Sequence, residues 1–146
     1  ESNAVITYDN LPEINGDVTQ LSQLLLNLLS NAIKFRQKDT PPKINIHHTS
    51  ESVFDPILET ETLWHNIVIH DNGIGFEQEF ADKIFIPFQR LHARSTYKGT
   101  GIGLAVCRRI VERHGGTILA KSQINQGTTF TLSIPHNYTA PVTAQL

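Results

Sequence analysis

The clearest pattern of hydrophobic positions in the chain lies between Asp17 and Ile33. Apolar side chains recur there at the spacing of one helical face, at Leu21, Leu24, Leu25, Leu28, Leu29, Ala32 and Ile33. Asp17 is a favourable N-cap residue, and Gln20 occupies the capping-box position three residues later. The pattern predicts an amphipathic helix whose apolar face packs on a core.

Short segments rich in β-formers, most of them with alternating polar and apolar residues, predict strands elsewhere. These segments cover residues 4–8, 43–49, 66–70, 117–121 and 128–134, and the last two are joined as a hairpin through residues 125–127. Residues 77–84 predict a short helix. The segment 50–63 holds four acidic residues and no basic one, so we expect a solvated connection there. Residues 136–146 are expected to form a tail or linker.

A second helix is predicted after the alternating glycines Gly99, Gly101 and Gly103, and it ends at the glycine pair 115–116. A glycine loop that runs into a helix N-terminus favours phosphate, because it presents unpaired N–H groups and a positive partial charge. The chain has no Gly-Lys pair for a Walker loop, and Leu104 stands where the dinucleotide and protein-kinase loops need a third glycine. A glycine-rich turn that caps an ordinary helix therefore stays open as an alternative.

Polar residues accompany both predicted helices. Asn27, Asn31 and Lys34 stand at i, i+4 and i+7 on the border of the first apolar face, where they face either a ligand or solvent. Residues 89–98, just before the glycine loop, carry three cationic side chains and no acid. This segment fits a lid over phosphates, and a soluble basic loop is the alternative.

Asp71 ends the third predicted strand and is followed by Gly73 and Gly75. A carboxylate at a strand end can accept a hydrogen bond from an amino group, and the two glycines would let a flat ring approach the backbone. An ordinary turn is the alternative, because Asn-Gly is a strong turn signal. The spacing leaves both interpretations open.

Composition narrows the class of protein. With 146 residues, 39% hydrophobic and 18% charged, the chain fits one compact globular domain. A net charge of -2 argues against a nucleic-acid partner, and no apolar run reaches membrane-spanning length. The lone Cys107 excludes a disulfide framework and a cysteine metal site and favours a reducing, cytoplasmic environment. Because the first residue is glutamate rather than methionine, we expect a piece of a longer protein.

Five sequence boxes occur together and in a fixed order. They are L-L-L-N-L-L-S-N-A-I-K-F (24–35), D-N-G-I-G-F (71–76), I-F-I-P-F (84–88), G-T-G-I-G-L (99–104) and G-T-T-F-T-L (127–132). They resemble the N box, first glycine box, F box, second glycine box and last glycine-threonine box of sensor histidine kinases. The segment F-Q-R-L-H-A-R (88–94) looks like the lid of phytochrome-related and PAS-linked members. The resemblance covers nearly the whole chain.

The resemblance implies an α+β fold, a two-layer sandwich in which a mixed, mostly antiparallel sheet carries about three helices on one face. This Bergerat-type fold is shared with gyrases and mismatch-repair ATPases, and it binds ATP between the helices under a lid. Residues 1–135 would form the catalytic ATP-binding domain of a histidine kinase, and residues 136–146 the tail.

The resemblance also implies a set of site residues. Asp71 would bind the adenine amino group, with Thr129 supporting Asp71 or its bridging water. Asn31 would give a side-chain oxygen to Mg²⁺, and Asn27 and Lys34 would face the phosphates. The full set implied for ATP is Asn27, Asn31, Lys34, Asp71, Gly73, Gly75, Phe88, Gly99, Thr100, Gly101, Gly103, Leu104 and Thr129, and the catalytic candidates are Asn27, Lys34, Arg90 and Arg94.

Asn27 stands where the hydrolytic relatives typically carry a glutamate that activates water. An amide cannot act as a base at neutral pH, so we expect weak hydrolysis and a γ-phosphoryl group left for an in-line acceptor. No stretch resembles the helical phosphoacceptor motif of the family, so the acceptor histidine is expected upstream in the parent protein. The implied partners are this phosphoacceptor domain and a response-regulator receiver domain, and the chain itself is expected to be monomeric.

Three other functions share the predicted fold. An independent gyrase-like ATPase is opposed by Asn27. An anti-sigma-factor-like kinase would transfer the phosphoryl group to a serine, and the type of acceptor does not follow from this domain alone. A degenerate module would keep the boxes for ATP or partner binding without turnover, but every box is intact here.

Overall fold

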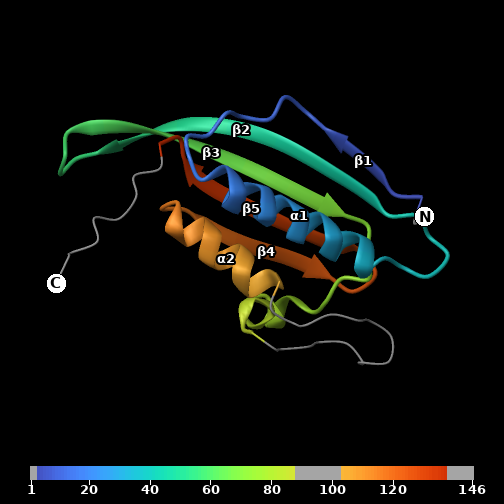
Figure 1. The fold of residues 1–146 in the computed structure, drawn as a ribbon. Coiled ribbons are helices and arrows are strands. Elements are labelled where there is room, and N and C mark those ends of the chain that lie inside the picture. Colours follow the sequence, from blue (N-terminus) through green and yellow to red (C-terminus); the bar gives the residue numbers. More distant parts are fainter. Residues whose placement is uncertain (1–2, 88–102, 138–146) are drawn as a thin grey trace.

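The computed structural model describes residues 3–87 and 103–137 (Figure 1). The elements in chain order are β1 (Val5–Tyr8), α1 (Val18–Lys34), β2 (Lys43–Asp55), β3 (Thr60–Asp71), the 3₁₀ helices η1 (Gln78–Phe80) and η2 (Lys83–Phe85), α2 (Gly103–Arg113), β4 (Thr117–Gln123) and β5 (Gly127–Pro135). The five strands form one layer, and α1 and α2 lie on the same face of it (Figure 1). This arrangement confirms the expected α+β two-layer sandwich.

The sheet is mixed and mostly antiparallel, with the strand order β1-β2-β3-β5-β4. β1 runs parallel to β2, and all other neighbouring strands are antiparallel. β3 and β5 therefore lie inside the sheet, where the end of β3 at Asp71 meets the beginning of β5 at Gly127. This junction positions the candidate site.

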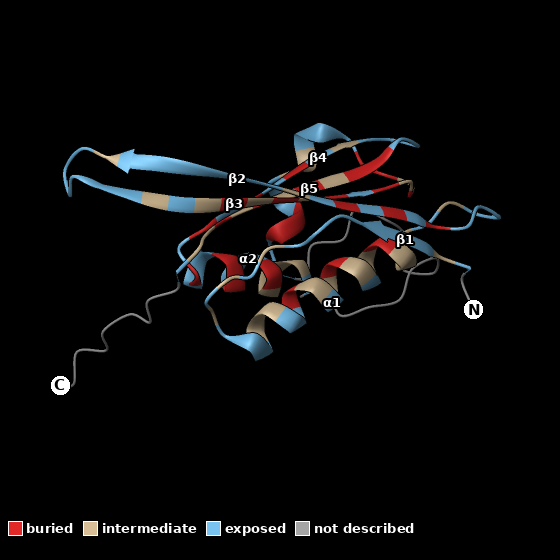
Figure 2. Cartoon of the chain, turned by 90° about the horizontal axis from the view of Figure 1, so that it is seen from above, coloured by how far each residue is buried: buried red, intermediate tan, exposed pale blue. Residues whose placement is uncertain are grey.

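The core lies between the sheet and the two α-helices (Figure 2). Alternate residues of the strands and one stripe of each helix are buried there, among them Leu24, Leu28, Ala32, Ile44, Ile46, Ile67, Ile69, Cys107, Ile110, Val111, Ile118, Phe130, Leu132 and Ile134. On α1, Leu24 and Leu28 are 2% and 1% exposed, whereas Leu26 on the outer side is 63% exposed. The predicted apolar face of this helix is therefore confirmed.

Polar side chains secure the ends of the helical layer. Asp17 caps α1, because its Oδ1 accepts a hydrogen bond from Gln20 N at 3.0 Å. The return bond of a capping box does not form, and the buried Gln20 Oε1 has no hydrogen-bond partner among the described residues. His114 joins the two helices, since its Nε2 accepts from Asp17 N at 3.1 Å and its Nδ1 donates to Ile110 O at 2.8 Å.

β2 and β3 form a hairpin that is longer than the sequence analysis predicts. The solvated connection expected over residues 50–63 is wrong, because the two strands stay paired as far as Asp55 and Thr60. The β-branched and aromatic residues of this segment favour extended backbone, and cross-strand pairing satisfies their peptide groups. Asp55 closes the turn, with its Oδ1 accepting from Ile57 N at 2.8 Å and Leu58 N at 3.2 Å.

Residues 77–84 do not form the short α-helix that the sequence predicts. They contribute instead to two separate 3₁₀ turns, η1 and η2, and each turn is anchored to a different part of the fold. In η1, Gln78 Nε2 donates to Ala120 O at 3.2 Å, and Gln78 Oε1 accepts from Ser122 N at 2.9 Å, which ties the turn to β4. In η2, two apolar side chains are buried in the core.

The first residues after β5 remain bonded to the rest of the fold. His136 N donates to Leu63 O at 2.8 Å, and Asn15 N donates to His136 O at 2.9 Å. Asn15 also forms a bridge with Asn137. The folded part therefore continues past residue 135 to Asn137. Across the described ranges, no helix has the length and apolar character needed to cross a membrane.

Candidate functional site

Asp71 is the centre of the candidate site. It ends β3 on the face that the helices cover, and it is 6% exposed. Its Oδ1 accepts hydrogen bonds from Gly73 N at 2.8 Å and Thr128 N at 3.2 Å, whereas no described residue donates to Oδ2. Burial raises the pKa of Asp71, while these two bonds and the nearby His70 act in the opposite direction. Among the described residues, the carboxylate thus has one oxygen that two N–H groups hold and one open oxygen that accepts no hydrogen bond.

The glycines after Asp71 allow three backbone segments to meet. A Cβ on Gly73 would lie 2.6 Å from Phe35 O, at the end of α1. Gly75 has a φ of +65°, and a Cβ there would lie 2.2 Å from Gln123 O. We predict from the sequence that these glycines let a flat ring approach the backbone, and this role stays a prediction. The structure adds a second reason for them, which is the contact of the loop with α1 and with the β4–β5 turn.

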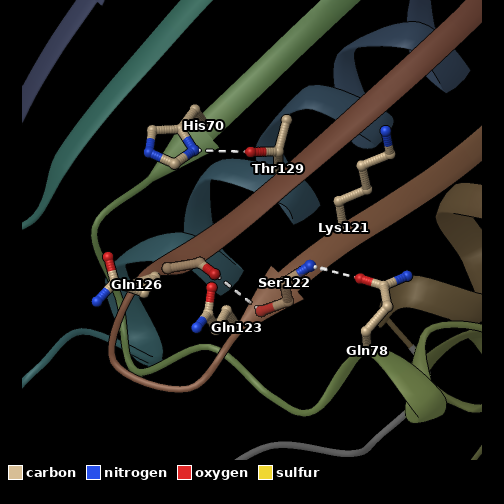
Figure 3. A pocket seen from close by; sticks show the side chains of 8 residues that line it. His70, Gln78, Lys121, Ser122, Gln123, Gln126 and Thr129 are labelled. Atoms are coloured by element: carbon tan, nitrogen blue, oxygen red, sulfur yellow. Dashed lines mark hydrogen bonds between the residues drawn. The ribbon is translucent and has the colours of Figure 1, made fainter.

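The residue that supports Asp71 from β5 is Thr128, not Thr129. Neighbouring strand residues point to opposite faces. Thr128 shares the buried face with Asp71, whereas Thr129 Oγ1 bonds to His70 Nδ1 at 2.7 Å on the other face (Figure 3). The predicted role of Thr129 is therefore wrong. Along this strand the apolar residues Phe130 and Leu132 alternate with Thr129 and Thr131, and this period of two is the sequence signal that could have placed Thr128 on the buried face.

The face of the sheet that the helices leave open also has a pocket. Its lining comes from the ends of β3, β4 and β5, from the β4–β5 turn and from η1, and includes His70, Gln78, Lys121, Gln123, Gln126 and Thr129 (Figure 3). β3 and β5 separate this pocket from Asp71, since His70 and Thr129 alternate with Asp71 and Thr128. It is therefore not part of the candidate site.

The polar stripe of α1 lies beside α2. Asn27, Asn31 and Lys34 are all half-buried, and Asn27 acts to lower the pKa of the nearby Cys107 thiol, which itself donates to Leu24 O at 3.8 Å. Burial is the main effect on that thiol and raises the pKa of Cys107 to about 12. Lys34 Nζ lies 4.9 Å from the ring centroid of Phe35, the residue whose carbonyl meets the Asp71 loop. The stripe therefore leads along α1 toward the candidate site.

Several predicted site residues lie outside the described part of the chain. These are Phe88, Arg90, Arg94, Gly99, Thr100 and Gly101, and their roles stay predictions. Gly103 begins α2, and Leu104 packs partly against the core. Within residues 3–87 and 103–137, no group of three or more His, Cys, Asp or Glu side chains could hold a metal ion.

The sequence did not point to Gln37, a residue that contacts both the glycine turn after Asp71 and the β4–β5 turn. Gln37 lies just after α1, and its Nε2 donates to Asn72 O at 3.1 Å and to Gly73 O and Asn125 O at 3.2 Å. No local pattern marks this glutamine, because the carbonyls that it contacts come from distant parts of the chain.

A mixed sheet with its helices on one face, and a buried carboxylate beside a glycine turn at its centre, define a Bergerat-type ATP-binding domain. The chain belongs to the family described as histidine kinase-, DNA gyrase B-, and HSP90-like ATPase, whose model matches residues 16–138.

Three known proteins illustrate the similarity. Cyanobacterial phytochrome A of Nostoc sp. is 47% identical over 135 residues, which cover 92% of this chain and 16% of that protein. The adaptive-response sensory kinase SasA of Synechococcus elongatus is 38% identical over 138 residues, which cover 90% of this chain and 32% of that protein. The nucleotide-free catalytic domain of the histidine kinase ThkA is 29% identical, with a TM-score of 0.69 and coverage of 93% and 82%. The chain thus spans less than a fifth of the phytochrome.

Proposed function

We propose that this chain binds Mg-ATP and donates the γ-phosphoryl group to a histidine on a separate phosphoacceptor domain, in two-component signalling. The observation that carries the proposal is the buried Asp71 carboxylate, which has one oxygen held by two backbone N–H groups. Relatives named as histidine and sensory kinases support the reaction. Because the chain spans only part of these proteins, the acceptor domain and a receiver domain belong to the proposal.

The open oxygen of Asp71 explains a preference for adenine. Adenine presents an amino group on its Watson–Crick edge, which can donate to a carboxylate oxygen. Guanine presents a carbonyl oxygen at the same ring position, which would face the carboxylate without a proton between them. Because Asp71 is buried, its carboxylate oxygen would be shielded from water without gaining a hydrogen bond, and the full desolvation cost would remain. Asp71 therefore selects the base as well as binding it.

The polar stripe of α1 is the proposed phosphate side of the site. Asn31 would give its amide oxygen to Mg²⁺, a cation that prefers oxygen ligands and keeps several from phosphate and water. Bound Mg²⁺ would neutralise charge on the phosphate oxygens. Lys34 contributes a positive charge at the same end of α1, and Arg90, Arg94 and the second glycine box remain proposed partners of the phosphates.

Asn27 decides between hydrolysis and transfer. Its side-chain amide cannot remove a proton from water, so the domain lacks a base at the position where hydrolytic relatives carry one. Phosphoryl transfer depends mainly on the position of the acceptor and on charge neutralisation. The chain is therefore proposed to retain ATP until an acceptor histidine is supplied, working as a monomer in the cytoplasm, where ATP is available.

Calorimetric titration tests the nucleotide site. A non-hydrolysable ATP analogue is titrated, with and without Mg²⁺, into the chain and into Asp71→Asn, Asn31→Ala and Glu61→Gln. Glu61 is exposed at the opposite end of β3, so its variant controls for the loss of a carboxylate. We expect micromolar or somewhat weaker binding that Asp71→Asn abolishes, Asn31→Ala weakens mainly with Mg²⁺, and Glu61→Gln leaves intact. No binding by the unchanged chain would refute the proposal.

A second experiment tests the acceptor. The chain is mixed with ATP and a histidine-containing helical hairpin from a histidine kinase, and the phosphorylated product is treated with acid and with base. Phosphohistidine is lost in acid, whereas phosphoserine is lost in strong base. We expect an acid-labile product that forms only when the hairpin is present. An acid-stable product on a serine-containing acceptor would instead support the anti-sigma-factor-like alternative.

A further inference from the structure

Gln37 joins the two backbone segments that hold Asp71. Its Nε2 lies 3.1 Å from Asn72 O and 3.2 Å from Gly73 O, both in the glycine turn after β3. It also lies 3.2 Å from Asn125 O, in the turn between β4 and β5. One side-chain amide therefore bridges two turns that are far apart in the sequence.

The three contacts determine the chemistry required at this position. Carbonyl oxygens only accept hydrogen bonds, so the group between them must donate. The NH₂ end of the Gln37 amide has two hydrogens to share among the three carbonyl oxygens. In the flipped orientation the amide oxygen would face these three oxygens, and no hydrogen would lie between them. A carboxylate at position 37 would be repelled by all three oxygens. A short apolar residue would leave them without this donor.

Both turns deliver an N–H group to the same carboxylate oxygen. Asn72 and Gly73 belong to the turn in which Gly73 N donates to Asp71 Oδ1. The turn at Asn125 leads into β5, where Thr128 N donates to that oxygen. We infer that Gln37 is a positioning residue, which fixes these two N–H groups and so orients Asp71 toward adenine. This inference rests on the proposed nucleotide site and adds a determinant of its base selectivity.

Other bonds hold the same segments in the fold when Gln37 is replaced. Ile74 N donates to Phe35 O at 2.9 Å, and Asn125 N donates to Ile74 O at 2.8 Å. Lys43 N donates to Asn72 Oδ1 at 2.8 Å. The effect of a substitution at Gln37 is therefore expected in the fine orientation of the two turns, with the fold retained.

Four variants of the full chain test the inference. Gln37→Ala removes the donor, Gln37→Glu replaces it with a repelled carboxylate, and Gln37→Lys keeps a donor group that can reach the carbonyls. Gln126→Ala is the matched control, because this exposed glutamine lies in the same β4–β5 turn and makes no side-chain hydrogen bond to the described residues. Each variant is titrated with non-hydrolysable ATP and GTP analogues, and its thermal unfolding is followed without nucleotide.

We expect Gln37→Ala to bind the ATP analogue about tenfold more weakly and to lose part of its preference over the GTP analogue. Gln37→Glu is expected to lose more, Gln37→Lys to stay within about threefold of the unchanged chain, and Gln126→Ala to match it. A residue that only stabilises the fold would shift unfolding and leave the ratio of the two affinities unchanged. An unchanged ratio in Gln37→Ala and Gln37→Glu overturns the inference.

Amide hydrogen exchange provides a readout that needs no nucleotide. In Gln37→Ala we expect faster exchange at the Gly73 and Thr128 amides, and unchanged exchange in the core of α1. Unchanged exchange at both amides overturns the inference even if ATP binds. If exchange changes as expected but the unchanged chain binds no nucleotide, the proposed function fails and the adenine part of the inference fails with it, while the bridge between the turns stands.

Discussion

We expect acid to destabilise the fold through a row of three histidines at the far end of the sheet from Asp71. His48 Nε2 lies 2.9 Å from His65 Nδ1, and His65 Nε2 lies 2.9 Å from His136 Nδ1. The three residues come from β2, from β3 and from the segment after β5. His65, in the middle, is 6% exposed. The row therefore links three parts of the chain through hydrogen bonds between imidazole groups.

Protons determine whether the row stays intact. When all three rings are neutral, each can donate with one nitrogen and accept with the other, so both hydrogen bonds form. Each of the two ring contacts has room for one hydrogen, so two protons added to the neutral row would make two N–H groups face each other. Burial lowers the pKa of His65 below its ordinary value of 6.5, and the charges of His48 and His136 lower it further.

The lowered pKa gives the sign of the pH dependence. Below pH 6.5, the unfolded chain binds a proton at His65 that the folded chain excludes. The stabilising contribution is therefore fully present above this value and is lost as the pH falls through the folded pKa. A difference of one bound proton changes the free energy of unfolding by about 1.4 kcal/mol per pH unit. Loss of one hydrogen bond in the row costs about 1 kcal/mol.

Urea unfolding between pH 8 and pH 5 measures this effect. His65→Gln keeps a donor and an acceptor but does not titrate, so we expect a shallower loss of stability in acid, by about 1 kcal/mol at pH 5. His47→Gln is the matched control, because His47 is exposed on the opposite face of β2. Equal acid sensitivity in the unchanged chain and in His65→Gln would refute the reasoning.

Three further predictions concern the core and the assignment of site residues. Leu28→Ala is expected to lower the free energy of unfolding by about 2–5 kcal/mol in urea titrations, because Leu28 is 1% exposed, whereas Leu26→Ala, at 63% exposure, is expected to cost about 1 kcal/mol or less. Cys107 is 0% exposed, and burial raises its thiol pKa to about 12. We therefore expect Cys107 to react with a thiol reagent at pH 8 only after the chain is unfolded in urea. Rapid labelling of the folded chain would contradict this expectation. Thr129→Val removes the bond to His70 on the face opposite Asp71, and it is expected to change ATP-analogue affinity by less than about twofold in calorimetry. A large loss would restore Thr129 to the nucleotide site.

The elements with a strong local pattern were predicted well. The apolar stripe of α1 and its Asp17 cap depend on residues within a few turns of one helix, so the sequence contains both. The core strands follow from alternation, and Asp71 was placed correctly at the end of β3. The extension of the β2–β3 hairpin between Ser50 and Leu63 was missed, because its acidic residues suggested a loop. Its two strands pair with each other, and the local sequence did not show this pairing.

The sequence by itself determined which residues are buried in α1 and in the core strands, because burial there follows the period of the backbone. It also determined the set of boxes through which the family is identified. Only the tertiary structure decided which side chains meet at the site. Strand register placed Thr128 rather than Thr129 beside Asp71, and chain packing brought Gln37 to three carbonyls of two distant turns. Such contacts depend on the relative position of whole elements, which the common core sets and no short segment encodes.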